Sequence, residues 1–449
     1  MPQKFVVSID ARDNTEYIRH VLNQENSTPM KNNGNPDTSS VLVIGAGIIG
    51  SCCALQLARL GYRVVLIDQH APGSGCSFGN AGSISSGSIT PMAMPGIWKN
   101  IPAWLSDKHG PLSVRWRYLI KAAPWLIGWL RASGKSAAIR SAGALSALHA
   151  GVLEGYQDFL GNEQFADLIR TTGQLVVHRS RPSGKDDEFA QQLRASYNVA
   201  SQNLGSAELR DLVPGLSTEF THGVLMQDAG FTVNPQRLVQ TIVQQFIESG
   251  GKLLTDKVLA VKPMDGFGVR VITRTGEVHA NNVVIATGAW SRTLVPDDEP
   301  KIPLETERGY HMMLYEPSIK PSLPVVAADY KFFSSPMEHG LRLAGTVEIA
   351  GLHAKPNWGR ANILLAHAKK IFPDLQVAGS SVWMGHRPSI PDSVPVIAES
   401  SRNKGVFYAF GHGHLGLSGA PGTARIMGNL ISGEQQNIDI SPFGLERFT

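Results

Sequence analysis

The sequence VLVIGAGIIG at Val41–Gly50 decides the fold of this chain. Its first four residues are apolar and largely β-branched, which predicts a short strand that is buried on both faces. The glycines that follow have the spacing G-x-G-x-x-G, and Ser51–Leu60 has the apolar periodicity of a helix. A second strand is expected at Tyr62–Ile67, and Asp68 ends it. The segment therefore predicts a strand–helix–strand unit.

Each residue of this loop has a physical role in holding a dinucleotide. Gly45 permits the tight turn, Gly47 lets the backbone approach a pyrophosphate, and Gly50 lets the helix pack closely on the strand. The free N–H groups and the positive dipole end of the helix face the phosphates. Asp68 lies 18 residues beyond Gly50, where a carboxylate binds a ribose diol. A glycine-rich turn without a ligand would not explain this combination.

The size and composition indicate a globular enzyme of two domains. The chain has 449 residues, 42% of them apolar and 17% charged, with a formal net charge of +4. No block of lysine or arginine indicates nucleic-acid binding. The three cysteines (Cys52, Cys53 and Cys76) lack metal-ligand spacing, so no metal site is expected. Their number fits a reducing cytoplasm, and the first two are expected to be small core residues on a helix.

Residues 1–40 are expected to be a disordered or wrongly assigned N-terminal arm. Residues 23–40 are rich in Asn, Ser, Pro and Gly, and no apolar run has the length of a secretory signal. Met30 is an alternative initiator. No run of 18 uncharged apolar residues occurs, so no membrane-spanning helix is expected.

The later sequence favours FAD over NAD. Residues 73–96 are small, polar and glycine-rich without helical or strand periodicity, which departs from the regular repeats of nicotinamide enzymes and suits a segment beside a long cofactor. The strand-to-glycine pattern returns at Val283–Ser291 and again at Val406–Gly416. A helix expected at Ala420–Ile431 would direct its positive end at this last loop, where it would stabilise a reduced flavin.

These motifs resemble the small-subunit family of D-amino-acid dehydrogenases, within the glutathione-reductase-type flavoproteins that include D-amino-acid and glycine oxidases. The matching residues are Val41–Gly50, Asp68, Ser77–Gly82, Pro91–Gly96, Thr287–Ser291, Gly385–Pro388 and Gly411–Gly419. The resemblance implies an α/β (α+β) fold: a Rossmann FAD-binding domain of the glutathione-reductase type with an inserted, mainly antiparallel β-sheet substrate domain. The expected FAD-binding segments are 41–91, 221–300 and 383–449, and the expected substrate domain comprises 92–220 and 301–382.

The resemblance also implies tightly bound FAD, with the adenine near Val258 and the flavin between Asn80–Ser83 and Gly413–Leu417. Non-covalent attachment is expected because no cysteine lies in the C-terminal half of the chain. The expected cofactor-binding residues are Gly45, Ala46, Gly47, Ile48, Ile49, Gly50, Asp68, Gln69, Ser77, Asn80, Ala81, Gly82, Ser83, Val258, Thr287, Gly288, Gly413, His414, Leu415, Gly416 and Leu417.

The expected substrate site centres on Arg387. A guanidinium is always charged, and its planar fork matches a carboxylate; in the resembling oxidases the arginine of the G-x-R-P motif holds the amino-acid carboxylate. The alternative is a structural arginine paired with a loop carbonyl or with Asp392. Tyr310 and His311 match a family strand motif, and His414 is expected near the flavin. Another expected strand carries two further candidates, Thr346 and Glu348.

A segment rich in tryptophan supports two interpretations. Five of the eight tryptophans lie between Trp98 and Trp129, accompanied by arginines and lysines. Such a segment is typical of a peripheral membrane contact, here through 98–131 at the inner membrane. The alternative is a helical pair packed on the substrate domain.

The predicted function is FAD-dependent oxidation of the C–N bond of a small amino acid: a D-amino acid, or a cyclic D-imino acid such as D-proline or hydroxy-D-proline. Electrons would pass to a quinone, an electron-transfer chain or oxygen. The first alternative is a peroxide-forming oxidase of a secondary amine acid of the glycine, sarcosine or iminodiacetate type. The second is an FAD-carrying subunit of a multi-subunit amine dehydrogenase.

Overall fold

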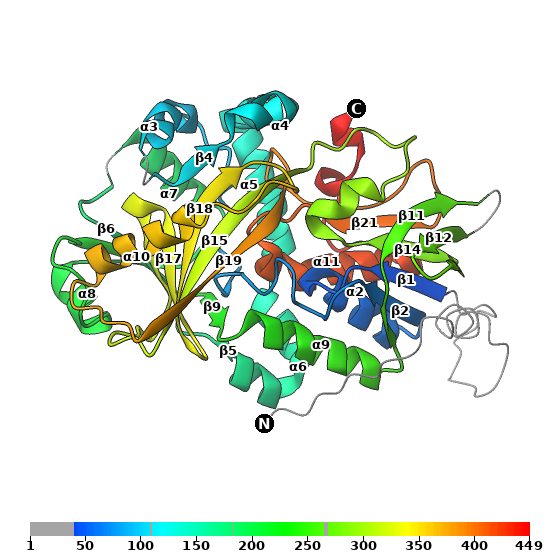
Figure 1. The fold of residues 1–449 in the computed structure, drawn as a ribbon, viewed down its shortest axis with the longest axis horizontal. Coiled ribbons are helices and arrows are strands. Elements are labelled where there is room, and N and C mark those ends of the chain that lie inside the picture. Colours follow the sequence, from blue (N-terminus) through cyan, green and yellow to red (C-terminus); the bar gives the residue numbers. More distant parts are fainter. Residues whose placement is uncertain (1–39, 108–109, 183, 265–267) are drawn as a thin grey trace.

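The computed structural model describes residues 40–107, 110–182, 184–264 and 268–449. The expected N-terminal arm lies outside these residues, except Ser40, which begins the first strand. Two lobes lie side by side, one built on a six-stranded sheet and the other on a nine-stranded sheet (Figure 1). Among the helices of the described residues, none is long and apolar enough to cross a lipid bilayer.

The first lobe is a mostly parallel sheet with the strand order β10-β2-β1-β14-β21-β20. Only β20 runs antiparallel to its neighbour. Its strands are β1 (Ser40–Ile44), β2 (Arg63–Asp68), β10 (Lys252–Thr255), β14 (Asn282–Ile285), β20 (Val396–Glu399) and β21 (Val406–Phe410). Strand β1 has β2 as its neighbour on one side and β14, which comes much later in the chain, as its neighbour on the other side. The topological switch point therefore lies at β1.

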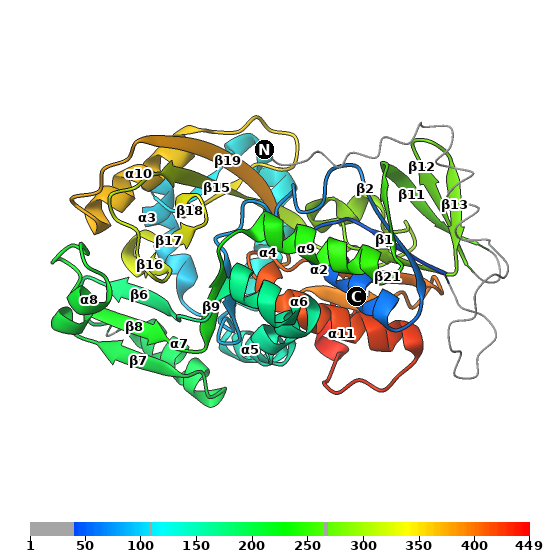
Figure 2. The ribbon, with the colours of Figure 1, turned by 90° about the horizontal axis from the view of Figure 1, so that it is seen from below.

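Side chains alternate between the two faces of β1, and each face is covered. Val41 and Val43 pack with five helices, whereas Leu42 and Ile44 pack under a small antiparallel sheet. The helices are α2 (Ile48–Arg59), α5 (Lys135–His149), α6 (Val152–Leu168), α9 (Pro235–Glu248) and α11 (Gly416–Ser432), which lie together in Figure 2. The small sheet comprises β11 (Val258–Pro263), β12 (Val269–Thr273) and β13 (Glu277–Ala280).

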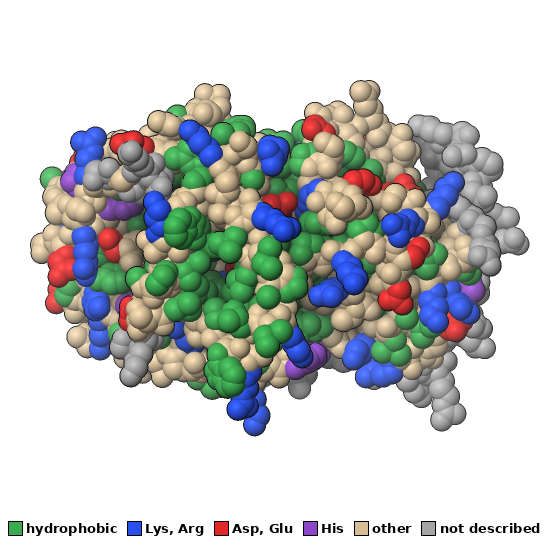
Figure 3. Space-filling model, turned by 90° about the horizontal axis from the view of Figure 1, so that it is seen from above, with side chains coloured by type: hydrophobic (Ala, Val, Ile, Leu, Met, Phe, Trp, Pro, Cys, Tyr) green, Lys and Arg blue, Asp and Glu red, His purple; other side chains and the backbone are tan. Residues whose placement is uncertain are grey.

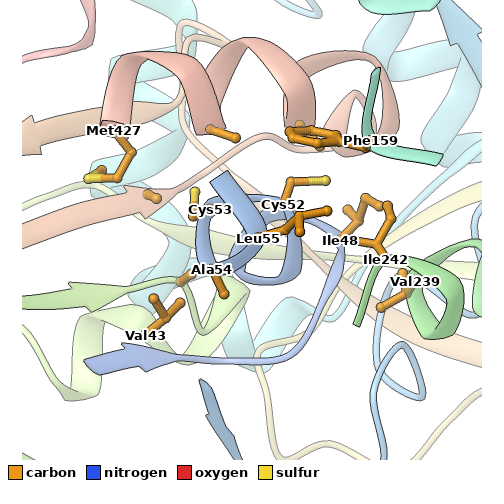
Figure 4. Packing of buried hydrophobic residues seen from close by; sticks show 14 of the residues in the cluster. Val43, Ile48, Cys52, Cys53, Ala54, Leu55, Phe159, Val239, Ile242 and Met427 are labelled. Carbon is orange, nitrogen blue, oxygen red and sulfur yellow. The ribbon is translucent and has the colours of Figure 1, made fainter. Parts of the chain in front are cut away.

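Cys52 and Cys53 are core residues of α2, as predicted. Both are fully buried, and burial raises the pKa of both thiols, that of Cys53 to about 12. Figure 4 shows Cys52 on the side of Phe159 and Cys53 on the side of Met427. The two thiols therefore fill space between α2 and the neighbouring helices.

The second lobe is a sheet with the order β19-β15-β18-β17-β16-β6-β8-β7, with β4 paired to β18. It is mainly antiparallel, since only the β16–β6 and β18–β4 pairs are parallel. Its strands are β4 (Leu112–Val114), β6 (Gln174–His178), β7 (Ser201–Leu204), β8 (His222–Met226), β15 (Glu305–Tyr315), β16 (Val325–Ala327), β17 (Phe332–Met337), β18 (Gly340–Ile349) and β19 (Gly379–Ser389). The two sheet types match the fold class predicted from the sequence.

Shorter elements complete the chain. A three-stranded sheet of β3 (Ser83–Ser85), β9 (Ala229–Thr232) and β5 (Ile169–Arg170) lies beside α6. The remaining helices are α3 (Ile101–Ser106), α4 (Leu119–Ala132), α7 (Lys185–Ser196), α8 (Ser206–Leu212) and α10 (Gly359–Ile371). The 3-10 turns are η1 (Ile97–Asn100), η2 (Trp116–Tyr118), η3 (Gly288–Thr293), η4 (Ala328–Tyr330), η5 (Ser441–Phe443) and η6 (Glu446–Phe448).

Some predicted boundaries were wrong. Helix α2 begins three residues before the predicted Ser51, and helix α11 begins four residues before the predicted Ala420. In both cases glycine-containing residues that were predicted as loop form the first turn of the helix. The segment 73–96 contains a short strand, β3, that periodicity could not reveal. The division into domains stays a prediction. It assigned β8 and most of β19 to FAD-binding segments, whereas both strands pair within the nine-stranded sheet.

Candidate functional site

The glycine loop lies at the carboxyl end of β1 and cannot accept side chains at two positions. Gly45 has a φ of +107°, and a Cβ there would lie 2.5 Å from the carbonyl oxygen of Ala286. A Cβ on Gly50 would lie 1.9 Å from the carbonyl oxygen of Gly45. Gly50 thus permits the close contact between helix and strand that the sequence predicted.

The donors and acceptors around this loop suit a dinucleotide. Helix α2 starts with Gly47 at its N-cap, without an acidic residue in its first turn, so its N-terminal N–H groups can meet phosphate. The N–H of Ile48 donates to Ser77 Oγ at 3.0 Å. Asp68 ends β2, and its Oδ2 accepts from the N–H of Ala46 at 2.8 Å. This carboxylate is half-buried beside exposed Gln69, in reach of a ribose.

Open space next to the loop fits the expected cofactor. A Cβ on Gly47 would meet only Ser77 Oγ, at 3.4 Å, and a Cβ on Gly75 or Gly413 would meet nothing within 4 Å among the described residues. A chain of backbone N–H groups beside such space is what a pyrophosphate requires. The residues present therefore fit FAD.

Further predicted cofactor residues lie around the same edge of the sheet. Thr287 and Gly288 follow β14, whose neighbour Ala286 donates its N–H to the carbonyl of Ile44. Val258 begins β11 just after Asp256, whose N–H donates to the backbone carbonyl of Asp68. These contacts place both segments beside the glycine loop.

The segment of Asn80, Ala81, Gly82 and Ser83 connects the loop to the substrate lobe. Asn80 Oδ1 accepts from the N–H of Gly82, and β3 begins at Ser83. The N–H of Ser85 donates to Ser418 Oγ at 3.0 Å, which ties β3 to the start of α11. The two segments expected around the flavin therefore lie next to one another.

The start of α11 brings the second group of predicted residues to this place. Gly413 donates its N–H to the carbonyl of Pro388 at 2.7 Å. A Cβ on Gly416 would lie 3.8 Å from Ile48, so α11 starts beside α2. The first-turn N–H groups of a helix have no acceptor within it. Those of α11, which include Leu417, can therefore complement negative charge at this end of the helix.

Arg387 lies on β19 with its guanidinium over β15. A Cβ on Gly309 would lie 2.2 Å from Arg387 Cζ, which shows how closely the guanidinium crosses this glycine. Among the described residues it makes one hydrogen bond, from Nη1 to the carbonyl of Thr346 at 3.3 Å. Thr346 holds a φ of +57° at a bulge between β15 and β18. Asp392, the alternative partner, pairs with Arg447 instead.

The charge of Arg387 acts on a group of neighbouring side chains. Desolvation by the surrounding protein, and then the charge of Arg387, lower the pKa of His414 to about 4, although its side chain is exposed among the described residues. Burial, Arg342 and Arg387 lower the pKa of His311 to about 3. Burial raises the pKa of Glu307, and the positive charge of Arg387 partly offsets this rise. The site thus holds two arginines, Arg387 and Arg342, beside imidazoles whose pKa values are lowered.

The structure does not bring Tyr310 to this site. Side chains alternate along β15, so Tyr310 lies on the face opposite Gly309 and His311. Its hydroxyl donates to Glu348 Oε2 at 2.5 Å and accepts from the N–H of Asn357. Glu348 also pairs with arginines on that face, so both residues belong to a buried polar cluster beneath the sheet.

Sequence reasoning missed two residues that shape the site. Arg342, a charged residue within the apolar run of β18, donates to the carbonyls of Phe78 (2.8 Å) and Asn80 (2.7 Å) and is buried. Trp383 stacks on His311, whose Nδ1 donates to the carbonyl of Gly79 at 3.1 Å. A lone charge inside a buried strand is the sequence signal that could have identified Arg342.

Comparisons with known proteins agree with this geometry. A family model described as "DAO: FAD dependent oxidoreductase" matches residues 40–430. A protein named "D-amino-acid oxidase" from Bradyrhizobium diazoefficiens is 39% identical over 420 residues, which cover 92% of this chain and all of that protein. A "D-amino acid dehydrogenase" from Rhizobium rhizogenes is 29% identical, covering 91% of this chain and 99% of that protein.

Solved structures share the fold at lower identity. The L-proline dehydrogenase from P. horikoshii has a TM-score of 0.69 at 20% identity, covering 92% of this chain and 98% of that structure. The glycine oxidase from Geobacillus kaustophilus has a TM-score of 0.67 at 21% identity, covering 92% and 100%.

Proposed function

Since this chain belongs to the family of FAD dependent oxidoreductases, we propose that it oxidises the C–N bond of a small D-amino acid or cyclic D-imino acid. The resemblance found in the sequence is thereby confirmed at the level of the family. The names of the two relatives support a D-amino acid as substrate. The observation that carries the proposal is Arg387, a half-buried guanidinium that makes a single hydrogen bond within the described residues, at the start of α11.

Arg387 binds the substrate carboxylate. A guanidinium offers five N–H donors, and the hydrogen bond to Thr346 uses only one. The lowered pKa values of His311 and His414 keep both imidazoles neutral near pH 7, and Arg342 donates to two backbone carbonyls, so Arg387 is the cation that selects an anionic group here. A bidentate pair also fixes the orientation of the carboxylate and therefore of the adjacent Cα.

His414 receives the amine. Its neutral imidazole offers a lone pair, and the nearby charge of Arg387 disfavours an ammonium in the same cleft. The substrate therefore reacts as the neutral amine, which its C–H bond cleavage requires. No general base for Cα–H is assigned, because the hydrogen leaves with both bonding electrons.

When bound, FAD would supply a hydride acceptor, and the N-terminal N–H groups of α11 would complement the negative charge that it gains on reduction. Loss of hydride converts the neutral amine to an iminium, and water hydrolyses it to a keto acid and ammonium. A cyclic substrate yields a cyclic imine instead. Trp383 and His311 stack over the 78–80 segment and exclude water from this side of the cleft.

The acceptor of the electrons decides between two candidate activities. The relatives are named as an oxidase and as a dehydrogenase, so both oxygen and a quinone or electron-transfer chain are proposed acceptors. Rapid peroxide formation in air would favour the oxidase. A peripheral contact with the inner membrane through 98–131 is proposed as well.

The test is anaerobic mixing of the purified, FAD-loaded protein with D-, L- and N-alkyl amino acids while the visible spectrum is recorded. Fast bleaching by a D- or cyclic amino acid supports the proposal, and Arg387→Met should raise the required concentration at least a hundredfold. Arg402→Met, at a surface loop near Asp298, is the matched control. A bound flavin that no amino acid reduces would refute the proposal and leave the FAD-carrying subunit as the alternative.

A further inference from the structure

The surface formed by Met92–Arg131, here called the α3–α4 face, exposes an unusual amount of apolar side chain. Of sixteen large hydrophobic residues that are exposed in the described part of the chain, half belong to this segment. They are Met92 (37%), Trp98 (54%), Leu105 (49%), Trp116 (77%), Leu119 (47%), Ile120 (85%), Ile127 (49%) and Leu130 (49%). In Figure 3, which views the molecule from above α3 and α4, hydrophobic side chains cover the middle of the face and lysines and arginines lie around them.

The exposed side chains occupy one stripe, because the opposite side of α4 is fixed to the protein. Trp125 is 6% exposed, and its Nε1 donates to the carbonyl of Ser389 at 3.1 Å. Gly128 packs on Pro391 so closely that a Cβ would lie 3.1 Å from it. Trp116, Ile120 and Ile127 follow the helical spacing on the outer side. The tryptophan-rich segment therefore has a packed inner side and an apolar outer side.

The charge of this segment is unlike that of the rest of the chain. Residues 92–140 contain eight lysines or arginines and one acidic residue, Asp107, a formal charge of +7. Because the whole chain carries +4, the other 400 residues together carry −3. Two of the cations lie against exposed tryptophan rings: Arg117 at 5.2 Å from the Trp116 ring centroid and Lys99 at 5.9 Å from that of Trp98.

We propose that the α3–α4 face binds the surface of an anionic lipid bilayer, with α4 lying in the plane of the interface. Exposed tryptophan and isoleucine enter the boundary between headgroups and acyl chains, and the surrounding cations meet anionic headgroups. A second copy fits this face poorly, because a two-fold contact places the same patch on itself and so sets +5, the formal charge of residues 92–131, against +5. Both the apolar stripe and the charge thus favour lipid.

Binding in this way brings the substrate lobe to the bilayer. Trp125, on the inner side of α4, donates to the carbonyl of Ser389, and the hydroxyl of Ser389 donates to Glu307. Glu307 is the residue opposite Arg387 in the pairing of β15 with β19. The lipid-facing surface and the site therefore share one rigid connection. The proposal rests on the peripheral membrane contact of the proposed function and specifies its lipid, whereas its test is separate from the proposed oxidation, since vesicle binding needs no substrate and no turnover.

The experiment is sedimentation of the FAD-loaded full chain with vesicles of phosphatidylcholine, alone or with added phosphatidylglycerol, at low salt. The wild-type protein should sediment with the anionic vesicles only, and added salt should release it. Lys121→Glu should weaken binding by at least roughly fivefold, and the double variant Trp116→Ser/Ile120→Ser by roughly tenfold or more. Flavin content should be the same in all variants.

Matched controls lie on the other lobe. Leu259→Ser removes a side chain that is 50% exposed on β11, and Lys262→Glu reverses a charge on the same strand; neither should change vesicle binding. The proposal is overturned if the wild-type protein does not sediment at low salt, or if the controls weaken binding as much. It is also overturned if light scattering shows a dimer that Trp116→Ser/Ile120→Ser separates, because a second copy then covers the face.

Discussion

Replacing Gly309 by alanine tests the carboxylate-binding role of Arg387 without changing the arginine itself. The new Cβ would lie 2.2 Å from Arg387 Cζ, whereas ordinary contacts begin at 3.4 Å, so the guanidinium must move by about 1.2 Å. The contact is with the far end of a flexible, half-buried side chain, which can turn aside while the backbone of β15 stays in place. Alanine in a strand also restricts the unfolded chain, so the melting temperature should hold or rise slightly.

Function should respond strongly to this shift. A misplacement of about 1 Å in a positioning group costs roughly a hundredfold in rate, so kcat/KM for amino-acid oxidation should fall by about that factor. The assay is stopped-flow flavin reduction together with the dissociation constant of a carboxylate inhibitor, which should weaken in parallel. Gly379→Ala is the control, since its Cβ would lie 3.7 Å from Tyr315, an ordinary contact. An unchanged kcat/KM in Gly309→Ala, with native melting temperature and flavin content, would refute the role of Arg387.

Three further outcomes follow from the geometry. Gly50→Ala would force a Cβ to 1.9 Å from a backbone oxygen of its own loop, so melting temperature and FAD content should both fall, by about 1–3 kcal/mol in stability, whereas Gly134→Ala should change neither. Arg342→Met leaves two carbonyls of the 78–80 segment without a donor, at about 1–3 kcal/mol each, and should weaken FAD binding in a flavin-release titration; unaltered affinity would contradict this. Burial, and then the neighbouring imidazole of His149, lowers the pKa of His412 to about 3, so the unfolded state binds more protons below about pH 6.5 and stability is lost as the pH falls toward 3. His412 should contribute about 2 kcal/mol of the loss between pH 6.5 and 5 in urea titrations, beside His149, His311, His386 and His414, and His412→Gln should reduce the total loss by about that amount. An equal pH slope in that variant would count against the assignment.

The sequence alone determined the cofactor loop. The requirements on Val41–Gly50 are a buried strand, a turn with positive φ at Gly45, and a glycine at position 50 where helix meets strand. Neighbours along the chain satisfy the requirement at Gly50, and Asp68 follows after one helix and one strand, whereas distant segments bury the strand and place Ala286 against Gly45. Such a pattern can be interpreted without knowing how the rest of the chain folds, which is why dinucleotide binding followed from it; the choice of FAD and the family rested on the later motifs as well.

Only the tertiary structure decided the composition of the substrate site. Arg387, His311 and His414 come from β19, β15 and the loop before α11, and cross-strand pairing brings them together. Tyr310 adjoins His311 in sequence but lies on the other face, because successive strand residues point in opposite directions. Motif spacing does not specify which face of β15 lies toward the substrate site. The register between β15 and β19 specifies it.

The same distinction applies to the tryptophan-rich segment. Its composition permitted either a packed helical pair or an interfacial surface, and the structure shows one packed side, with Trp125 inside, and one exposed apolar side, with Trp116 outside. Burial depends on what packs against each side of α4, which is Ser389 and Pro391 from more than 250 residues away in sequence. A sequence gives the periodicity of a helix, but the partner that covers one side of it is set by long-range contacts.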